Sequence, residues 1–191
     1  MHATKRISIV VALIASLITS ANTFAEAYEI ENSHTSVIFS ISHFGYSYCY
    51  GRFNKVSGEF NVDDSNPSAS TINVTIDAKS IDTNDKKRDE HLRGPDFFDA
   101  KQFPTVTFQS SSAEKIENGI RFNGKMTMHG ETKDVSLDMR RLGSGPGPQG
   151  KQRTGFFLQK TLKRSEFGVN GYLGKIGDDV SVTISLEGVK K

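Results

Sequence analysis

The sequence predicts an all-β fold, an eight-stranded antiparallel barrel with one short helix. Eight segments place apolar side chains at every second position, turn-forming residues separate them, and only one segment has a helical pattern. The chain has 191 residues, of which 36% are hydrophobic and 24% charged. These values are typical of a single globular domain. The single cysteine excludes a disulfide framework and any cysteine-rich zinc module.

The N-terminus has the three parts of a secretory signal peptide. Lys5 and Arg6 precede an uncharged apolar run at residues 7–18, and small residues follow in 20–27. A membrane span needs about 20 apolar residues, so this run is too short to cross a bilayer. We expect residues 1–25 to be the signal peptide, with cleavage after Ala25 or, alternatively, after Ala27. Residues 26–191 would then form one exported domain without a stable membrane span.

Period-2 alternation dominates the rest of the chain. In residues 37–43, for example, Val37, Phe39 and Ile41 share one face, while Ser40 and Ser42 share the other. One apolar face per strand is typical of an antiparallel sheet with one buried side. Eight such strands are enough to close a barrel around side chains or one ligand. The eight segments are residues 37–43, 60–62, 72–78, 106–108, 120–128, 135–139, 156–162 and 180–186.

Turn residues separate these segments. Residues 63–67, 117–119 and 129–131 combine Asp, Asn, Pro and Gly in the manner of hairpin connections. Residues 143–150, GSGPGPQG, are expected to form a flexible loop between two strands.

Residues 85–93 are predicted to form the one short helix. Asn84 or Asp85 would be its N-cap, and Gly94-Pro95 would end it. Asp89 and Arg93 are spaced as an i,i+4 ion pair that would stabilise the helix. Leu92 is its only apolar anchor. The aromatic residues of 97–103 are expected to pack beneath it at one end of the barrel.

No arrangement of residues indicates catalysis or metal binding. The four histidines after the signal peptide, His34, His43, His91 and His129, have no metal-ligand spacing. No phosphate-binding loop or nucleophile elbow is present, so we predict a non-enzyme with no catalytic residue, no metal and no cofactor. We expect His34 and His43 to be polar residues at the barrel end. His43 continues the inward phase of its strand and is the better candidate for a ligand contact.

The charge balance gives no reason to expect a basic partner. The whole chain has 24 Lys and Arg against 22 Asp and Glu. Lys5 and Arg6 belong to the signal peptide, which has no acid, so the processed chain has 22 of each. The basic run at residues 86–88 is flanked by Asp85, Asp89 and Glu90. Nucleic-acid binding is therefore not expected. Cys49 is expected to be a half-buried thiol or, alternatively, to form an intermolecular disulfide.

Four parts of the chain resemble the YceI-like family. The longest is residues 80–108, SIDTNDKKRDEHLRGPDFFDAKQFPTVTF. The others are residues 34–58, with His34, His43 and Gly51-Arg52-Phe53, and residues 124–135 and 164–168. The resemblance implies a lipocalin-like barrel that holds a long polyisoprenoid chain, in the periplasmic branch of the family found in Gram-negative bacteria. Residues 47–50, SYCY, depart from the family pattern where a bulkier apolar pair is usual.

The alternation and the resemblance together lead to a hypothesis about function. We expect a periplasmic protein that binds a long-chain polyisoprenoid or an isoprenoid quinone in the barrel, as carrier or store. A binder of fatty acids or other amphiphiles in a stress response is an alternative, and an enzyme acting on such a lipid is a further one. The oligomeric state is open, with a homodimer as one option. The residues expected to line the ligand site are Phe39, Ile41, His43, Ile72, Val74, Ile76, Phe108, Phe122, Met126, Met128, Phe156 and Leu158.

Overall fold

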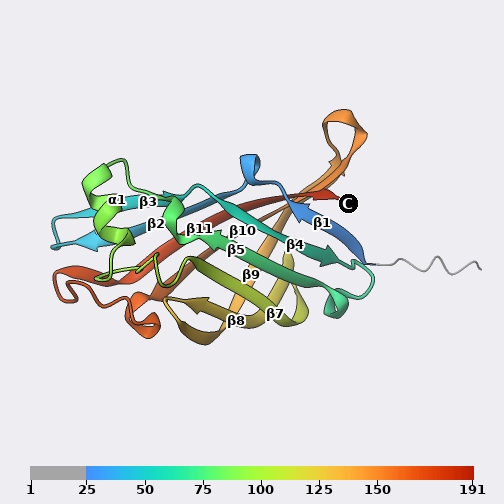
Figure 1. Cartoon of the computed structure of the whole chain (residues 1–191). Coiled ribbons are helices and arrows are strands. Elements are labelled where there is room, and N and C mark those ends of the chain that lie inside the picture. The colour runs from blue at the N-terminus through green and yellow to red at the C-terminus, as the bar shows by residue number, and fades with distance from the viewer. Residues whose placement is uncertain (1–24) are drawn as a thin grey trace, which may run out of the picture.

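The computed structural model describes residues 25–191, and the predicted signal peptide lies outside this range except for Ala25. Strands dominate, with one α-helix and five short 3-10 helices (Figure 1). The strands are β1 (Glu26–Ile30), β2 (Ser36–His43), β3 (Ser47–Phe53), β4 (Val56–Val62), β5 (Thr71–Asp77), β6 (Ile81–Asp82), β7 (Thr105–Ile116), β8 (Gly119–Met128), β9 (Glu131–Pro146), β10 (Gln152–Lys163) and β11 (Ile176–Lys190). The helices are α1 (Lys86–Arg93), η1 (Asn32–His34), η2 (Pro67–Ala69), η3 (Ala78–Ser80), η4 (Pro148–Gly150) and η5 (Arg164–Phe167).

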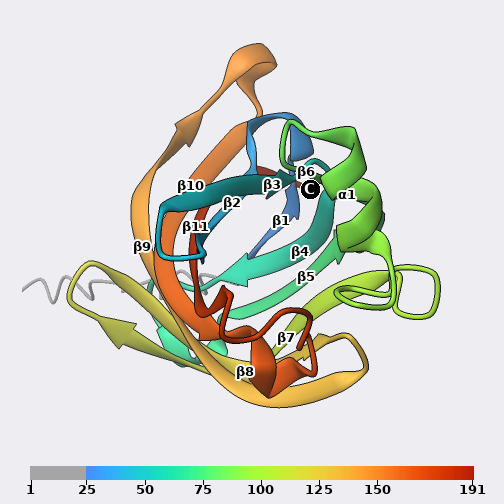
Figure 2. The ribbon, with the colours of Figure 1, turned by 90° about the vertical axis from the view of Figure 1, so that its left-hand side faces the viewer.

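The sheet closes into the predicted eight-stranded antiparallel barrel. Its ring follows the order β1-β4-β5-β7-β8-β9-β10-β11, and β11 pairs back with β1. Near its C-terminal end β11 pairs with β1, and near its N-terminal end it pairs with β2. β1 and β2 therefore occupy one place in the ring, separated by η1. β3 and β6 pair beside β2 and extend the wall at that end, which faces the viewer in Figure 2.

The inward phase of the strands agrees with the alternation in the sequence. Phe108 of β7 lies opposite Val74 of β5 on one side and Met126 of β8 on the other. Phe39 of β2 lies opposite Val182 of β11 in the same way. Cross-strand pairs of apolar side chains stabilise a sheet and here also build the interior. All five residues belong to the core cluster or pack against it.

Aromatic side chains close the end of the barrel opposite α1. The ring of Tyr28 stacks on Phe60 with centroids 5.2 Å apart, and Phe60 meets Phe156 edge to face at 5.7 Å. The guanidinium of Arg141 lies 5.9 Å from the centre of the Phe156 ring and pairs with Asp64. Burial, together with a hydrogen bond to Glu26, raises the pKa of Tyr28 to about 12. This end is therefore filled rather than open.

The predicted helix is present as α1, but its charged side chains contact the preceding segment. The Asp85 side chain accepts a hydrogen bond from the backbone N–H of Arg88 at 3.0 Å, which makes Asp85 the N-cap. The predicted Asp89–Arg93 ion pair is wrong. Asp89 is buried and accepts hydrogen bonds from Thr83, and Arg93 donates to the carbonyls of Lys79 and Ile81. Within residues 25–191 no helix is long and apolar enough to cross a membrane.

The turns follow the sequence with one exception. His129 and Gly130 form a two-residue hairpin between β8 and β9 with φ of 52° and 81°, as a tight β-turn of this kind requires. The expected loop at residues 143–150 is wrong in its first half. β9 continues to Pro146, and its Ser144 and Pro146 pair with Thr154 and Gln152 of β10. The hairpin of β9 and β10 extends beyond the barrel wall here (Figure 1). Its glycines therefore lie in paired strands and not in a loop.

Candidate functional site

The interior holds an apolar chamber toward the closed end, which we call the inner chamber. It has a volume of about 60 Å³. Its wall comes from the inward faces of seven strands of the ring and from β2, and apart from Thr107 and Lys160 the side chains are aliphatic, Met or Phe. The lining includes Ile72, Val74, Phe108, Leu158 and Leu186.

A second chamber, the middle chamber, continues from the inner one toward α1. It has a volume of about 160 Å³. Phe39, Ile41, Leu92, Phe97 and Met128 are among the residues that line it. The two chambers share part of their walls, so they lie next to each other along the barrel axis, and we treat them as one passage. The shared residues are Val37, Ile76, Val106, Met126, Leu162, Val182 and Ile184.

The passage opens at a third space of about 320 Å³, the mouth, beside α1. Figure 2 shows this end of the barrel, with α1 on one side and the β2–β3 hairpin in the upper part of the view. The mouth shares Phe39, Ile41, Leu92, Phe97 and Ile176 with the middle chamber. The inner chamber, the middle chamber and the mouth are together called the tunnel. It is apolar in its depth, closed at one end, and within the size range of small-molecule sites at its opening.

Most of the polar side chains that line the tunnel lie at the mouth. The lining there includes His43, Cys49, Thr83, Arg88 and His91. The guanidinium of Arg88 donates to the hydroxyl and the carbonyl oxygen of Thr83, each at 2.7 Å. No carboxylate within residues 25–191 forms an ion pair with Arg88, whereas His91 Nε2 lies 2.9 Å from Asp96. Arg88 is thus a fixed positive charge at the opening of an apolar tunnel. Cys49 is a half-buried free thiol at the same opening.

The structure brings together most of the residues that the sequence predicted for the site. Ten of the twelve line the tunnel: Phe39, Ile41, His43, Ile72, Val74, Ile76, Phe108, Met126, Met128 and Leu158. Phe122 and Phe156 do not, because both are almost fully buried in the core near the closed end. Their side chains point inward as expected, but too deep to border the open space. The binding role of the ten residues stays a prediction.

Several residues that line the tunnel were not predicted from the sequence to be part of the site. Leu92 and Phe97 were placed near the barrel end but not in the site, although both border the middle chamber and the mouth. Arg164 is the least expected, because it is only 4% exposed and still borders the middle chamber. Its guanidinium donates to the carbonyls of Gly177, Val169 and Ile176 at 2.8, 2.8 and 3.2 Å. Burial lowers the pKa of Arg164 from its ordinary value. The residue fixes the loop that forms one side of the mouth.

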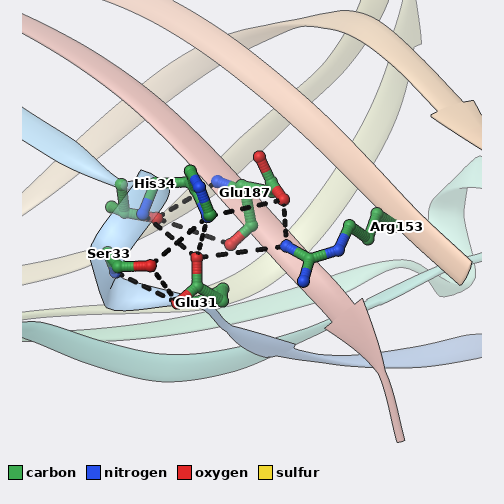
Figure 3. A network of polar contacts seen from close by, with 6 residues as sticks. Glu31, Ser33, His34, Arg153 and Glu187 are labelled. Atoms are coloured by element: carbon green, nitrogen blue, oxygen red, sulfur yellow. Dashed lines mark hydrogen bonds and ion pairs between the residues drawn. The ribbon is translucent and has the colours of Figure 1, made fainter. Parts of the chain in front are cut away.

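His34 lies away from the mouth, which corrects its predicted place beside His43. It sits in η1 and contacts Glu31, in a network that also holds Ser33, Arg153 and Glu187 (Figure 3). The hydroxyl of Ser33 and then His34 lower the pKa of Glu31 to about 2, against the opposite effect of burial. This network lies between β1, β10 and β11, on the wall of the barrel.

The network contains the only group of possible metal ligands found within residues 25–191. One ligand atom each from Glu31, His34 and Glu187 lie within 4.8 Å of one another. Arg153 already donates to Glu187, and its Nη1 lies 4.0 Å from a Glu31 oxygen. The guanidinium therefore supplies the positive charge that a bound cation would bring. The geometry favours a structural ion network, and the absence of a metal stays a prediction.

Comparison with known proteins agrees with this barrel. A family model described as YceI-like domain matches residues 28–188. Protein YceI of Salmonella arizonae is 39% identical over 181 residues, which cover 94% of this chain and 95% of that protein.

Solved structures show the same fold. The crystal structure of BcnA from Burkholderia cenocepacia is similar with a TM-score of 0.73 at 25% identity, covering 83% of this chain and 98% of that one. A polyisoprenoid binding domain from Saccharophagus degradans, implicated in plant cell wall breakdown, is similar with a TM-score of 0.62 at 16% identity, covering 87% of this chain and 99% of that one. The second likeness concerns the fold alone. With a matching family model over most of the barrel and a relative of this identity along nearly its whole length, the chain belongs to the YceI-like family.

Proposed function

We propose that this protein binds a long-chain isoprenoid lipid, a polyisoprenoid or an isoprenoid quinone, in its tunnel and serves as a carrier or store in the periplasm. The observation that carries the proposal is the tunnel itself, which is mainly apolar in depth, closed at one end and most polar at its mouth. The structural neighbour from Saccharophagus degradans, which is described as a polyisoprenoid binding domain, supports the choice of ligand.

The driving force for such binding is removal of the chain from water. Each methylene group buried contributes about 0.8 kcal/mol, so a few isoprene units suffice for tight binding. Met126 and Met128 border the tunnel, and their unbranched, polarisable side chains adapt to an irregular branched guest. Loose contacts along the chain leave recognition to the headgroup at the mouth, where His43 and Arg88 offer hydrogen-bond donors.

The proposal includes no chemical step on the lipid. Among the described residues, the polar groups at the mouth comprise a thiol, two histidines, a threonine and an arginine, and each histidine meets at least one aromatic ring edge to face. Arg88 and Thr83 are bound to each other, and Thr83 is also held by Asp89. We therefore assign the mouth to holding a headgroup rather than to proton transfer or nucleophilic attack.

The test is identification of the bound lipid. The full chain is expressed in a Gram-negative host, purified from the periplasmic fraction without detergent, extracted with organic solvent and analysed by mass spectrometry. We expect an isoprenoid in near-stoichiometric amount and chemically unchanged. Mass spectrometry of the intact protein gives its first residue, which we expect to be Glu26 or Tyr28. A stoichiometric fatty acid or other amphiphile would overturn the choice of ligand, and an empty barrel would overturn the binding function.

A further inference from the structure

Exposed aromatic side chains concentrate at the mouth end of the barrel. Eight large apolar or aromatic side chains are exposed within residues 25–191, and seven lie on β2, β3, their connecting turn and the loop before β11. Tyr46 is 89% exposed, Tyr48 67% and Tyr50 65%. The eighth, Leu142, lies on β9 away from this end. We call the group of Phe44, Tyr46, Tyr48, Tyr50, Tyr172 and Leu173 the aromatic rim. Exposed apolar patches of this kind mark interaction sites.

The tyrosines of β3 have no packing partners across the sheet. Tyr48 pairs with Ser42 of β2, and Tyr50 pairs with Ser40, so each ring stands beside a small side chain on the outer face. A solvent-facing strand position ordinarily carries a polar residue. Cys49 and Gly51 are inward positions of the same strand, and Phe53 points inward at its far end, so over residues 48–51 β3 presents its large side chains outward. Because these tyrosines face outward, their rings are available for contact with a partner.

The aromatic rim borders the mouth of the tunnel directly. The N–H of Phe44 donates to the carbonyl of Lys175 at 2.8 Å, which ties the β2–β3 turn to the loop before β11. Phe44 stacks on Tyr46 at 6.5 Å, and Tyr172 stacks on Phe97 at 6.1 Å. Phe44, Tyr172 and Phe97 also line the mouth. A surface that covered the aromatic rim would therefore cover the opening of the tunnel as well.

The charges on these two segments have one sign. Residues 44–53 and 168–177 contain no carboxylate, and their cations are Arg52 and Lys175. Lys175 forms no ion pair among the described residues, whereas Arg52 lies opposite Asp82 of β6 and interacts electrostatically with its carboxylate. On the other side of the mouth, α1 carries charges of both signs. Exposed aromatic rings beside the unpaired cation Lys175 complement a surface of anionic headgroups over hydrocarbon, where Tyr rings take up the interfacial position.

We propose that the aromatic rim docks the barrel, mouth first, on the surface of a phospholipid bilayer that contains anionic lipid. The rings of Tyr46, Tyr48 and Tyr50 lie at the headgroup level, and Lys175 contacts the phosphates. In this position an apolar chain passes between the bilayer and the tunnel without crossing water. The docking goes beyond the proposed isoprenoid binding and does not depend on which lipid the tunnel holds.

Vesicle flotation tests the docking. The processed protein, purified from the periplasmic fraction, is mixed with vesicles of phosphatidylcholine alone or with three parts in ten of phosphatidylglycerol, and the bound fraction is measured after flotation. We expect binding to the anionic vesicles that weakens at high salt. The double variant Tyr46→Ser, Tyr48→Ser should bind at least about tenfold more weakly, because two interfacial rings are lost. The matched control is Leu142→Ser, which removes an exposed apolar side chain away from the mouth and should bind as the wild type does.

Three results would overturn the proposal. The first is absence of wild-type binding to either vesicle, and the second is an equal loss in the double variant and the Leu142→Ser control. The third is a dimer in sedimentation velocity that the double variant dissociates, since the rim would then cover a second copy of the chain. Lipid extraction of the same variants distinguishes failure of bilayer docking from failure of lipid binding in the tunnel. Tyr46 and Tyr48 do not line the tunnel, so the double variant should retain its lipid.

Discussion

Replacing Ile184 with aspartate tests directly whether the tunnel holds an apolar chain. Ile184 lies on β11 and borders both the inner and the middle chamber. Its neighbours across the sheet are Leu158 of β10 and Val37 of β2, which are also apolar. A chain that fills both chambers must pass this position. The bound chain would remove water from the carboxylate of the new aspartate, and burying an unpaired charge costs free energy.

The size of the effect follows from the ability of the carboxyl group to take up a proton. Protonation removes the charge, so the cost of protonation sets the upper limit on the loss of binding. An ordinary Asp titrates near pH 4, so at pH 7 this cost is about 4 kcal/mol, at about 1.4 kcal/mol per pH unit. Lipid binding at pH 7 should therefore weaken by up to roughly a thousandfold. At pH 5 the cost falls to about 1.5 kcal/mol, and the loss should shrink to roughly tenfold.

The assay is titration of delipidated protein with a fluorescent isoprenoid at both pH values. Thr183→Asp is the matched control, because Thr183 is the next residue on β11 and bonds Gln159 on the outer face. The empty variant should stay folded, since the middle chamber of about 160 Å³ can admit water to the carboxylate. Thermal melts verify this. Equal affinity of Ile184→Asp and Thr183→Asp at pH 7, or a loss that does not shrink at pH 5, would refute the reasoning.

Three further variants probe other parts of the structure. Arg164→Met removes the donors to three backbone carbonyls and should lower the free energy of unfolding by about 3 kcal/mol, or the melting temperature by about 6–12 °C; a shift below about 2 °C would contradict this. The folded-state pKa of Glu31 is lowered to about 2 from 4.5, so its stabilisation is present above pH 4.5 and is lost between pH 4.5 and 2. Glu31→Gln should accordingly be less stable than the wild type at pH 7 and equally stable near pH 2 in acid-unfolding curves, and a gap independent of pH would be inconsistent with this. In Gly51→Ala the new Cβ would lie 2.3 Å from Cζ of Phe39, so the ring must turn toward the tunnel. Binding of a fluorescent isoprenoid should weaken severalfold with little change in melting temperature, and unchanged binding would count against this placement of the ring.

The barrel could be predicted from the sequence because its strands have the simplest possible periodicity. Val182 and Phe39, for example, lie opposite each other inside the barrel, as their alternation with serine and threonine indicates. β3 escaped prediction because its pattern is inverted. Tyr48 and Tyr50 point outward and Cys49 and Gly51 point inward, so Phe53 is its one large inward side chain and no run of alternating apolar residues marks it as a strand.

The site was less predictable than the fold, because period-2 alternation gives the direction of a side chain but not its depth. Phe156 and Leu158 share one face of β10, yet Leu158 borders the inner chamber while Phe156 is packed at the closed end. Depth depends on the shear of the closed barrel, which no single strand encodes. The place of Arg164 depends on carbonyls of residues 169–177, which only the folded loop brings to its guanidinium.

The double pairing of β11 has a consequence for the order of folding. Residues 188–190 pair with β1, and residues 176–185 pair with β2. The pairing of both early strands is therefore complete only after the last strand of the sequence has folded. Contacts of such long sequence separation carry a high loop-closure cost and form slowly. Until β11 pairs, the sheet from β1 to β10 has two open edges, and its apolar face is exposed to water. We therefore expect the open-edged intermediate to be the state most prone to aggregate, and closure by β11 to end that exposure.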